Sequence, residues 1–273
     1  MKTSTIGTWI KRILLGVLGL IGLLVVVVVG IVVVDANFGD KVTNHTNITY
    51  PGEGGVTLNG YLAEPEGEGT YPGILLIHEW WGLNEGITIL ADALAAEGYV
   101  VLAVDAYRGE VTNQIARAII LRTTTPQEQI FADVDAGFAH LQSLPNVNTD
   151  KLASMGFCFG GGESLQLGMR QSEDLALTIM YYGSVVTDLD ALRPLTESDG
   201  VLGIFGEEDQ QILVEDVLEF EAAMNTLNIE NEVTIYEGVG HAFLNEENYN
   251  KSGAAGEAWQ QTLAFLEREF GDE

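Results

Sequence analysis

The sequence predicts an α/β protein, in which a mainly parallel sheet carries helices on both faces and one transmembrane helix precedes the sheet. Short apolar runs alternate with amphipathic stretches after residue 55, which is the rhythm of parallel strands joined by helices. Residues 13–34 form an unbroken apolar run, and no acidic residue occurs before its end. That run predicts the membrane helix.

The N-terminal run is long enough to anchor the chain. As a helix it reaches about 33 Å, against a hydrocarbon core of about 30 Å. Lys2, Lys11 and Arg12 precede it and only Lys41 follows closely, so residues 1–12 are expected in the cytoplasm and the rest of the chain on the extracytoplasmic side. The alternative is a cleaved signal and a secreted protein. A signal usually has an apolar part of about 7–15 residues and ends at a small-residue cleavage site.

The remaining chain divides into a polar linker, 35–55, and one large domain, 56–273, with room for a sizeable core. Alternating apolar residues predict an edge strand or part of a hairpin at 56–64. Six apolar runs predict strands at 73–78, 99–105, 151–157, 175–183, 200–206 and 232–238. Amphipathic stretches predict helices at 84–97, 126–144, 161–171, 214–228 and 252–269. Asn84 and Gly98 are typical of the cap and the stop of the first helix.

The chain after residue 34 is strongly acidic. It carries all 40 acidic residues and nine of the 12 basic ones, a net charge of about −31. Such a surface repels nucleic acid and anionic lipid, so nucleic acid is not an expected partner. Abundant acids with scarce lysine indicate adaptation to a salty medium or, alternatively, an ordinary acidic secreted protein. The single cysteine permits no intramolecular disulfide.

That cysteine, Cys158, lies in the stretch "MGFCFGGG". A lone cysteine is most often a small buried hydrophobe. Here Gly156, Cys158 and Gly160 form G-x-C-x-G, the nucleophile-elbow pattern with cysteine in place of serine. The helix that follows is expected to lower the pKa of the thiol, and the N–H of Phe159 to contribute to an oxyanion hole. A dinucleotide-binding loop is the rival explanation, but its G-x-G-x-x-G spacing is absent.

A nucleophile needs a base, and His241 is the histidine best placed to be one. It lies in the loop "GVGHAFLN" after the last predicted strand. The other histidines fall in the linker, at a strand end and within a helix: His45, His78 and His140. Asp209, in "FGEEDQQI", is best placed to orient the base. The order Cys158, Asp209, His241 is the nucleophile–acid–base order of the α/β-hydrolase fold, which the sequence therefore predicts.

One further acid stands out. Glu79, in "IHEWWGLN", follows directly on an apolar strand and precedes two tryptophans. A charge is costly there unless it is used or paired. Glu79 is therefore either a functional carboxylate or one hydrogen-bonded to backbone at the rim of the domain.

Together these residues resemble the dienelactone hydrolase family. The motifs "HEWWGLN", "DAYRGE", "GFCFGG", "GEED" and "GHAF" follow that family's order and approximate spacing over nearly all of residues 50–270. The resemblance implies that Cys158 is the nucleophile and that His241 and Asp209 complete the triad. It also implies that Glu79 contacts the resting thiol, and that substrate binding releases the thiolate. No metal and no organic cofactor is implied.

The resemblance extends to the substrate site. It implies an oxyanion hole made by the N–H groups of Phe159 and Trp80, with Trp81 beside the substrate. The founding enzymes hold a substrate carboxylate with arginines, one of which lies shortly after the catalytic histidine. The matching position here is Asn245. Either Arg117 or Arg122 is expected to supply another contact. Loss of an arginine leaves a bound carboxylate short of a bidentate partner, so esterase chemistry is expected more firmly than a dienelactone substrate.

The sequence thus predicts a membrane-anchored or exported hydrolase of small esters or lactones that forms an acyl-cysteine intermediate. A small molecule is the expected partner, along with the membrane through residues 13–34. The alternatives are a non-catalytic hydrolase-like domain that binds a ligand at the cell surface, and a thioesterase on the same fold. The oligomeric state is not predicted.

Overall fold

An eight-stranded sheet forms the centre of the domain in the computed structural model, which describes residues 4–271. Its order is β1-β2-β4-β3-β5-β6-β7-β8. The strands are β1 (Ile48–Pro51), β2 (Thr57–Ala63), β3 (Tyr71–Ile77), β4 (Val100–Val104), β5 (Val147–Phe157), β6 (Leu177–Tyr181), β7 (Gly200–Gly206) and β8 (Asn231–Tyr236). β2 pairs antiparallel with both β1 and β4, and from β4 to β8 every neighbouring pair is parallel. The predicted mainly parallel sheet is confirmed.

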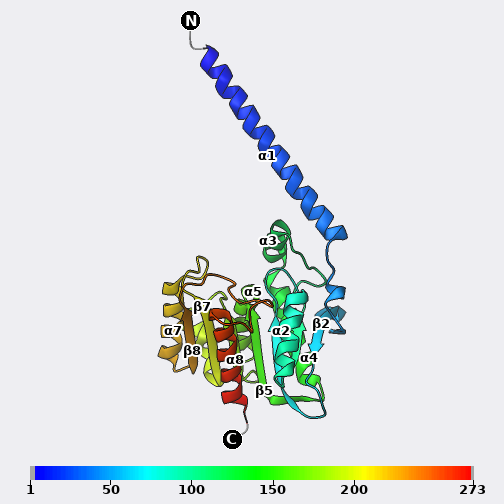
Figure 1. The fold of residues 1–273 in the computed structure, drawn as a ribbon, viewed down its shortest axis with the longest axis vertical. Coiled ribbons are helices and arrows are strands. Elements are labelled where there is room, and N and C mark those ends of the chain that lie inside the picture. The colour runs from blue at the N-terminus through cyan, green and yellow to red at the C-terminus, as the bar shows by residue number, and fades with distance from the viewer. Residues whose placement is uncertain (1–3, 272–273) are drawn as a thin grey trace.

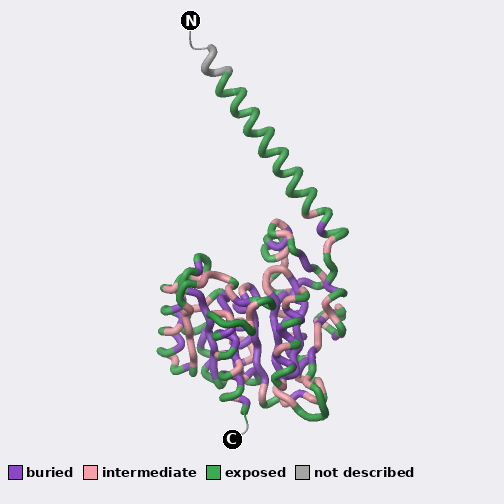
Figure 2. The backbone as a smooth tube through the Cα atoms, viewed as in Figure 1, coloured by how far each residue is buried: buried purple, intermediate pink, exposed green. Residues whose placement is uncertain are grey.

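Helices cover both faces of this sheet (Figure 1). The helices of the domain are α2 (Glu85–Ala96), α3 (Ile115–Thr124), α4 (Gln127–Ser143), α5 (Phe159–Arg170), α6 (Leu189–Leu192), α7 (Val214–Leu227) and α8 (Ala254–Phe270). Of these, α3 lies above the sheet, near the end of α1 (Figure 1). Alternate residues of β3 point to opposite faces. Ile74 and Leu76 pack with α2 and α8, whereas Leu75 and Ile77 pack with α4. α5 and α7 share a third cluster of buried side chains. The central strands of the sheet, from β4 to β7, are largely buried between these layers (Figure 2).

Most elements lie where the sequence predicts them, because they bury long apolar runs. Asn84 caps α2, and its side chain accepts from the N–H of Ile87 at 3.2 Å. The expected linker, 35–55, needs correction. It contains β1, whose Ile48 and Tyr50 pair with Gly60 and Leu58 of β2. The sheet therefore begins inside that stretch.

The N-terminal helix α1 runs from Ser4 to Phe38 and extends beyond the expected 13–34. Its segment Trp9–Phe38 is long and apolar enough to cross a membrane, and almost all of its side chains are exposed (Figure 2). Lys2, used to predict orientation, lies outside the described residues.

The end of α1 is held by the domain through a buried acid. Asp35 is only 8% exposed. Its carboxylate accepts from the hydroxyl of Thr112 at 2.5 Å and from Nη1 of Arg117 at 2.8 Å. The contact between α1 and the domain therefore includes a desolvated ion pair.

Candidate active site

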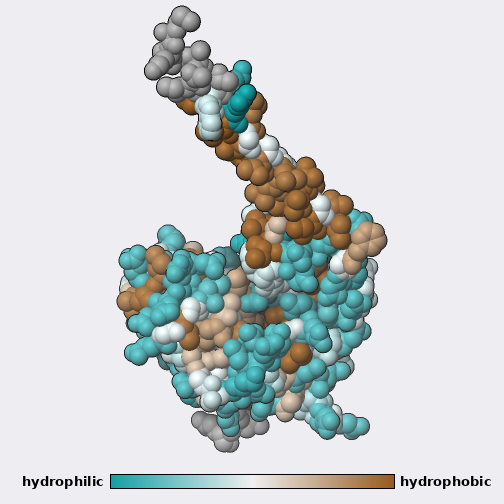
Figure 3. All heavy atoms as spheres, turned by 45° about the horizontal axis from the view of Figure 1, so that its top comes forward, coloured by the Kyte–Doolittle hydropathy of each residue, from teal (hydrophilic) through white to brown (hydrophobic). Residues whose placement is uncertain are grey.

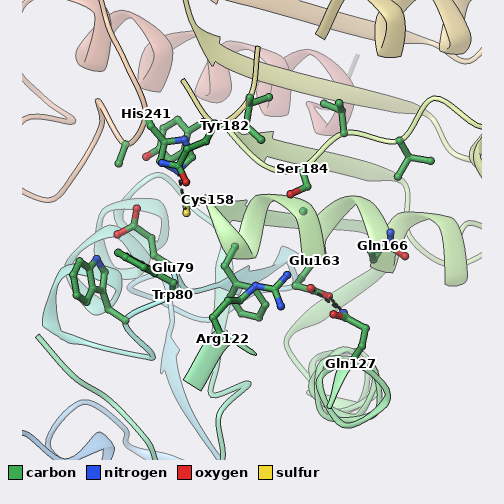
Figure 4. Close-up of a pocket in the computed structure, with 18 of the residues that line it drawn as sticks. Glu79, Trp80, Arg122, Gln127, Cys158, Glu163, Gln166, Tyr182, Ser184 and His241 are labelled. Atoms are coloured by element: carbon green, nitrogen blue, oxygen red, sulfur yellow. Dashed lines mark hydrogen bonds between the residues drawn. The ribbon is translucent and has the colours of Figure 1, made fainter. Parts of the chain in front are cut away.

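A cavity of about 710 Å³ opens at the carboxyl ends of the parallel strands (Figure 4). This is the edge where open α/β sheets place their ligands. Seven of the residues expected at the site line it: Glu79, Trp80, Trp81, Arg122, Cys158, Phe159 and His241. The fold thus brings together side chains from loops that lie far apart in the sequence.

The nucleophile elbow is formed where β5 meets α5. Cys158 has φ 54° and ψ −112°, a conformation that is strained for any residue with a side chain. The flanking glycines are required by close backbone packing. A Cβ on Gly156 would collide with the backbone of Gly160, and one on Gly160 would collide with the carbonyl of Ile77. The turn therefore lifts the thiol into the cavity at the start of a helix.

His241 lies between the thiol and an aspartate. Its Nδ1 is 2.7 Å from Oδ2 of Asp209, and its Nε2 is 3.0 Å from Sγ of Cys158. Because a carboxylate only accepts hydrogen bonds, Nδ1 carries the proton and Nε2 is free to accept one from the thiol. These contacts have the geometry expected of the predicted nucleophile, base and orienting acid.

Asp209 is fixed by its own loop. It is only 4% exposed, and Oδ1 accepts from the N–H groups of Gln211 at 2.7 Å and Ile212 at 3.1 Å. The second oxygen is thereby left for the imidazole. The neighbouring acids, Glu207 and Glu208, are exposed.

The electrostatics of the thiol correct one expectation. Burial, and after it the charge of Glu79, raises the pKa of Cys158 to about 12. The N–H of Phe159 acts in the opposite direction, but it does not compensate. The helix N-terminus therefore does not make this thiol acidic, because desolvation penalises the thiolate more. At rest the thiol is therefore protonated.

Glu79 is half-buried at the cavity wall (Figure 4). Burial raises its pKa to about 7, and the charge of Glu246 adds to the shift. The resemblance implied that Glu79 contacts the resting thiol, whereas the hydrogen-bond partner of the thiol here is His241. Glu79 acts on Cys158 through its charge in this arrangement.

A buried histidine holds the loop that carries Glu79. His78 accepts from the N–H of Ala106 at Nε2, at 3.1 Å, so its Nδ1 donates to the carbonyl of Glu79 at 2.5 Å. Burial lowers the pKa of His78 to about 4, which keeps the ring neutral. Sequence reasoning treated His78 only as the end of a strand. Its position beside Glu79 was the one available signal.

The two residues expected to supply the oxyanion hole, Phe159 and Trp80, both line the cavity. Phe159 is the first residue of α5, so its N–H has no acceptor within the helix. Trp80 lies across the cavity, in the loop after β3 (Figure 4). Both N–H groups come from residues that line the cavity beside Cys158.

The cavity lining also contains two residues that the sequence did not predict, Glu163 and Tyr182. Glu163 is only 5% exposed, and both its oxygens accept from Nε2 of Gln127 at 2.9 Å. The ring of Tyr182 lies 5.2 Å from that of His241, and its hydroxyl donates to the carbonyl of Leu244 at 2.9 Å. No sequence signal marks Glu163 or Tyr182.

The predicted substrate contacts are partly corrected. Arg122 lines the cavity, with its guanidinium 5.0 Å from the centre of the Phe159 ring. Arg117 does not, because it is buried against Asp35. Asn245 also lies outside the lining and caps a local turn, where its side chain accepts from the N–H of Glu247.

Residues 4–271 contain no group of three or more His, Cys, Asp or Glu side chains arranged to hold a metal ion. The cavity itself has two carboxylic acids, Glu79 and Glu163, and one guanidinium, Arg122, among its described lining residues.

Comparison with known proteins places this geometry in context. The model of the dienelactone hydrolase family matches residues 58–270. A putative carboxymethylenebutenolidase from Synechocystis sp. is 30% identical over 247 residues, covering 82% of this chain and 97% of that protein. A probable 2-oxo-3-(5-oxofuran-2-ylidene)propanoate lactonase from Bradyrhizobium sp. is 28% identical, covering 79% of this chain and 91% of its own length. The crystal structure of a putative dienelactone hydrolase from Klebsiella pneumoniae superposes with a TM-score of 0.68 at 24% identity, covering 81% of this chain and 99% of that one.

Proposed function

This chain belongs to the dienelactone hydrolase family, and we propose that it hydrolyses small carboxylic esters or lactones through an acyl-cysteine intermediate. The observation that carries the proposal is the continuous line of contacts from Asp209 through His241 to Cys158 at a cavity of about 710 Å³. A relative named as a lactonase supports lactones as one substrate class.

The first half-reaction forms the acyl-enzyme. Nε2 of His241 takes the thiol proton as Sγ of Cys158 forms a bond to the carbonyl carbon, and the carbonyl π electrons move to oxygen. The N–H groups of Phe159 and Trp80 receive that oxyanion. The oxyanion then collapses, the bond to the leaving oxygen breaks, and the imidazolium returns its proton to that oxygen. Asp209 keeps the ring in the required tautomer throughout.

The second half-reaction regenerates the enzyme. His241 takes a proton from water as the water oxygen attacks the acyl carbon. The carbon–sulfur bond breaks, the carboxylic acid leaves, and the sulfur regains a proton from the imidazolium. A lactone follows the same steps, except that its alcohol stays attached to the acyl group until this release.

Glu79 is proposed to keep the thiol at rest. Its charge is the second cause of the raised pKa of Cys158, after burial, so it opposes thiolate formation in the empty site. A substrate that displaces the carboxylate from the thiol would remove that opposition. The enzyme would then generate its nucleophile chiefly when an ester is bound.

The cavity favours an uncharged ester or lactone. Two carboxylates and one guanidinium line it, and the domain around it carries a net charge of about −31. A substrate with several carboxylates would meet like charges. Arg122 remains available for a single polar or anionic group near the ring of Phe159.

We also propose that α1 is an uncleaved anchor, with the catalytic domain on the extracytoplasmic side. The buried contact of Asp35 with Thr112 and Arg117 supports retention, because cleavage after Asp35 would deprive the desolvated guanidinium of Arg117 of a partner. Lys11 and Arg12 precede the apolar run, which favours a cytoplasmic N-terminus. Mass spectrometry of the mature N-terminus tests retention, since a chain that starts beyond residue 34 contradicts it.

Ester assays on two variants test the chemistry. We expect Cys158→Ala and His241→Ala to lose hydrolysis of short-chain p-nitrophenyl esters and of simple lactones. Iodoacetamide should inactivate the wild type and label Cys158. Full activity in Cys158→Ala would overturn the proposal. A thiol that reacts normally without turnover of any ester would indicate a binding domain, and turnover of thioesters alone would indicate a thioesterase.

A further inference from the structure

Helix α3 exposes an apolar face that nothing in the domain covers. Ile115, Ile119 and Ile120 are 62%, 48% and 43% exposed. The opposite side of the same helix is buried through Arg117 and Ala118. The helix is therefore amphipathic with its isoleucines pointing outward, where burying them would be favourable.

This face stands beside the end of the proposed anchor (Figure 1). A groove of about 510 Å³ runs between them, lined by Val27, Ile31, Val34 and Phe38 of α1 and by Gln114 at the start of α3. The apolar run of α1 ends at Val34. If α1 spans the bilayer, α3 therefore lies at the level where acyl chains give way to headgroups. Figure 3 shows apolar surface continuing from α1 onto the adjoining part of the domain.

The charge pattern distinguishes this region from the rest of the domain. Residues 111–127 contain no acid, the longest such run after Asp35, and include two arginines. A second copy of the chain is a poor occupant for the face, because two domains with net charges near −31 repel each other. The bilayer is the better occupant, because α1 already holds the domain beside it and no second charged domain has to approach.

We propose that Ile115, Ile119 and Ile120 insert into the acyl–headgroup boundary of the bilayer that holds α1. This inference rests on the proposed anchor. Inserted amphipathic helices bury their apolar face a few ångströms into that boundary. Arg122, one of the last residues of α3, lines the catalytic cavity. The same helix thus joins the lipid surface to the cavity wall and brings esters dissolved in the leaflet within reach of Cys158.

Spin labels on the full-length chain test the insertion. The background is Cys158→Ser, reconstituted into phosphatidylcholine vesicles, with one added cysteine per variant. Ile119→Cys reports the proposed face, Val26→Cys reports the anchor, and Leu218→Cys is the control. Leu218 is a comparably exposed side chain, 51%, on α7. Circular dichroism of each variant checks folding, and Ile115→Cys provides a second label on the face.

Collision with oxygen and with a water-soluble nickel chelate gives the depth of each label. We expect oxygen to be favoured several-fold over nickel at residues 26 and 119, and nickel to be favoured at 218. Residue 26 in lipid with 119 and 115 in water would overturn the inference and leave the anchor intact. Residue 26 in water would contradict the anchor itself. A label at 119 shielded from both reagents would show a second copy over the face, which also overturns insertion.

Discussion

The thiol of Cys158 is held in its protonated form by burial and by the charge of Glu79. Its assignment as a nucleophile candidate follows from the flanking glycines and from the order of Asp209 and His241 downstream. The direction of its pKa shift does not follow from the sequence. The helix N-terminus, which the sequence predicts, lowers the pKa, whereas burial and the charge of Glu79 raise it to about 12. Burial depends on the packing of distant loops, which the local pattern does not contain.

Glu79→Gln should make the thiol more acidic. Burial remains, so the pKa of Cys158 should fall from about 12 and stay above its ordinary value of 9.0. Losing the negative charge favours the thiolate. The rate of iodoacetamide alkylation, measured against pH, should therefore reach its midpoint at lower pH in the variant.

Glu163→Gln is the matched control, because it removes the same charge from the opposite wall of the cavity. Its midpoint should equal that of the wild type. Identical alkylation profiles for Glu79→Gln and the wild type would contradict the proposed effect of Glu79 on the thiol.

At the level of the elements, Gly160 determines how closely α5 approaches the sheet. A methyl group there would collide with the carbonyl groups of Ile77 and His78. Gly160→Ala should therefore lower the free energy of unfolding by about 3 kcal/mol. At Gly162, two residues along the same helix, a Cβ would find its nearest neighbour at 3.4 Å. Gly162→Ala should keep or slightly raise stability, because alanine favours helix.

Urea unfolding of both glycine variants makes the comparison. Equal stability of Gly160→Ala and Gly162→Ala would show that the close contact of α5 with β3 does not limit the fold.

His78 links the end of β3 to the end of β4 and should make stability depend on pH. Its pKa is about 4 when folded, against 6.5 for the ordinary side chain. The unfolded chain therefore binds the proton first as pH falls. The contribution of the neutral ring is complete above pH 6.5 and is lost between there and pH 4, up to roughly 3 kcal/mol.

A glutamine can accept and donate at the same place without titrating. The free energy of unfolding of the wild type, relative to His78→Gln, should therefore drop between pH 7 and pH 4.5. A difference between the two proteins that is the same at both pH values would contradict a neutral, hydrogen-bonded His78.

Two elements escaped sequence reasoning for physical reasons. β1 (Ile48–Pro51) is short and alternates imperfectly, so only its pairing with β2 identifies it as a strand. The apolar face of α3 points outward, so its isoleucines gave no signal of packing against the sheet. The long strands and helices were predictable because each buries its own periodic apolar pattern.

For the whole molecule, charge is the dominant property. A net charge of −28 repels itself in the compact state, and added salt screens that repulsion. The thermal midpoint should therefore rise by several degrees from 0.1 M to 2 M sodium chloride.

Potassium chloride at the same ionic strengths should give the same rise, because screening does not depend on the identity of the cation. A thermal midpoint that does not change with either salt would indicate that repulsion between the acidic residues does not destabilise the fold, as in an ordinary acidic secreted protein.

The assembly of the molecule was predictable in outline, because the motifs of the family cover nearly the whole domain. The contact between α1 and the domain was not predictable. Asp35 and Arg117 are far apart in the sequence, and Arg117 was expected at the substrate. Only the fold shows that its guanidinium is held by Asp35.

The central claim is that Cys158 carries the acyl group. The direct measurement is mass spectrometry of wild-type protein quenched during turnover of a p-nitrophenyl ester, with peptide mapping of the adduct. The account predicts one acyl group on the peptide that contains Cys158, and neither adduct nor turnover in Cys158→Ala. Undiminished hydrolysis by Cys158→Ala, or an acyl group on another residue, would contradict it.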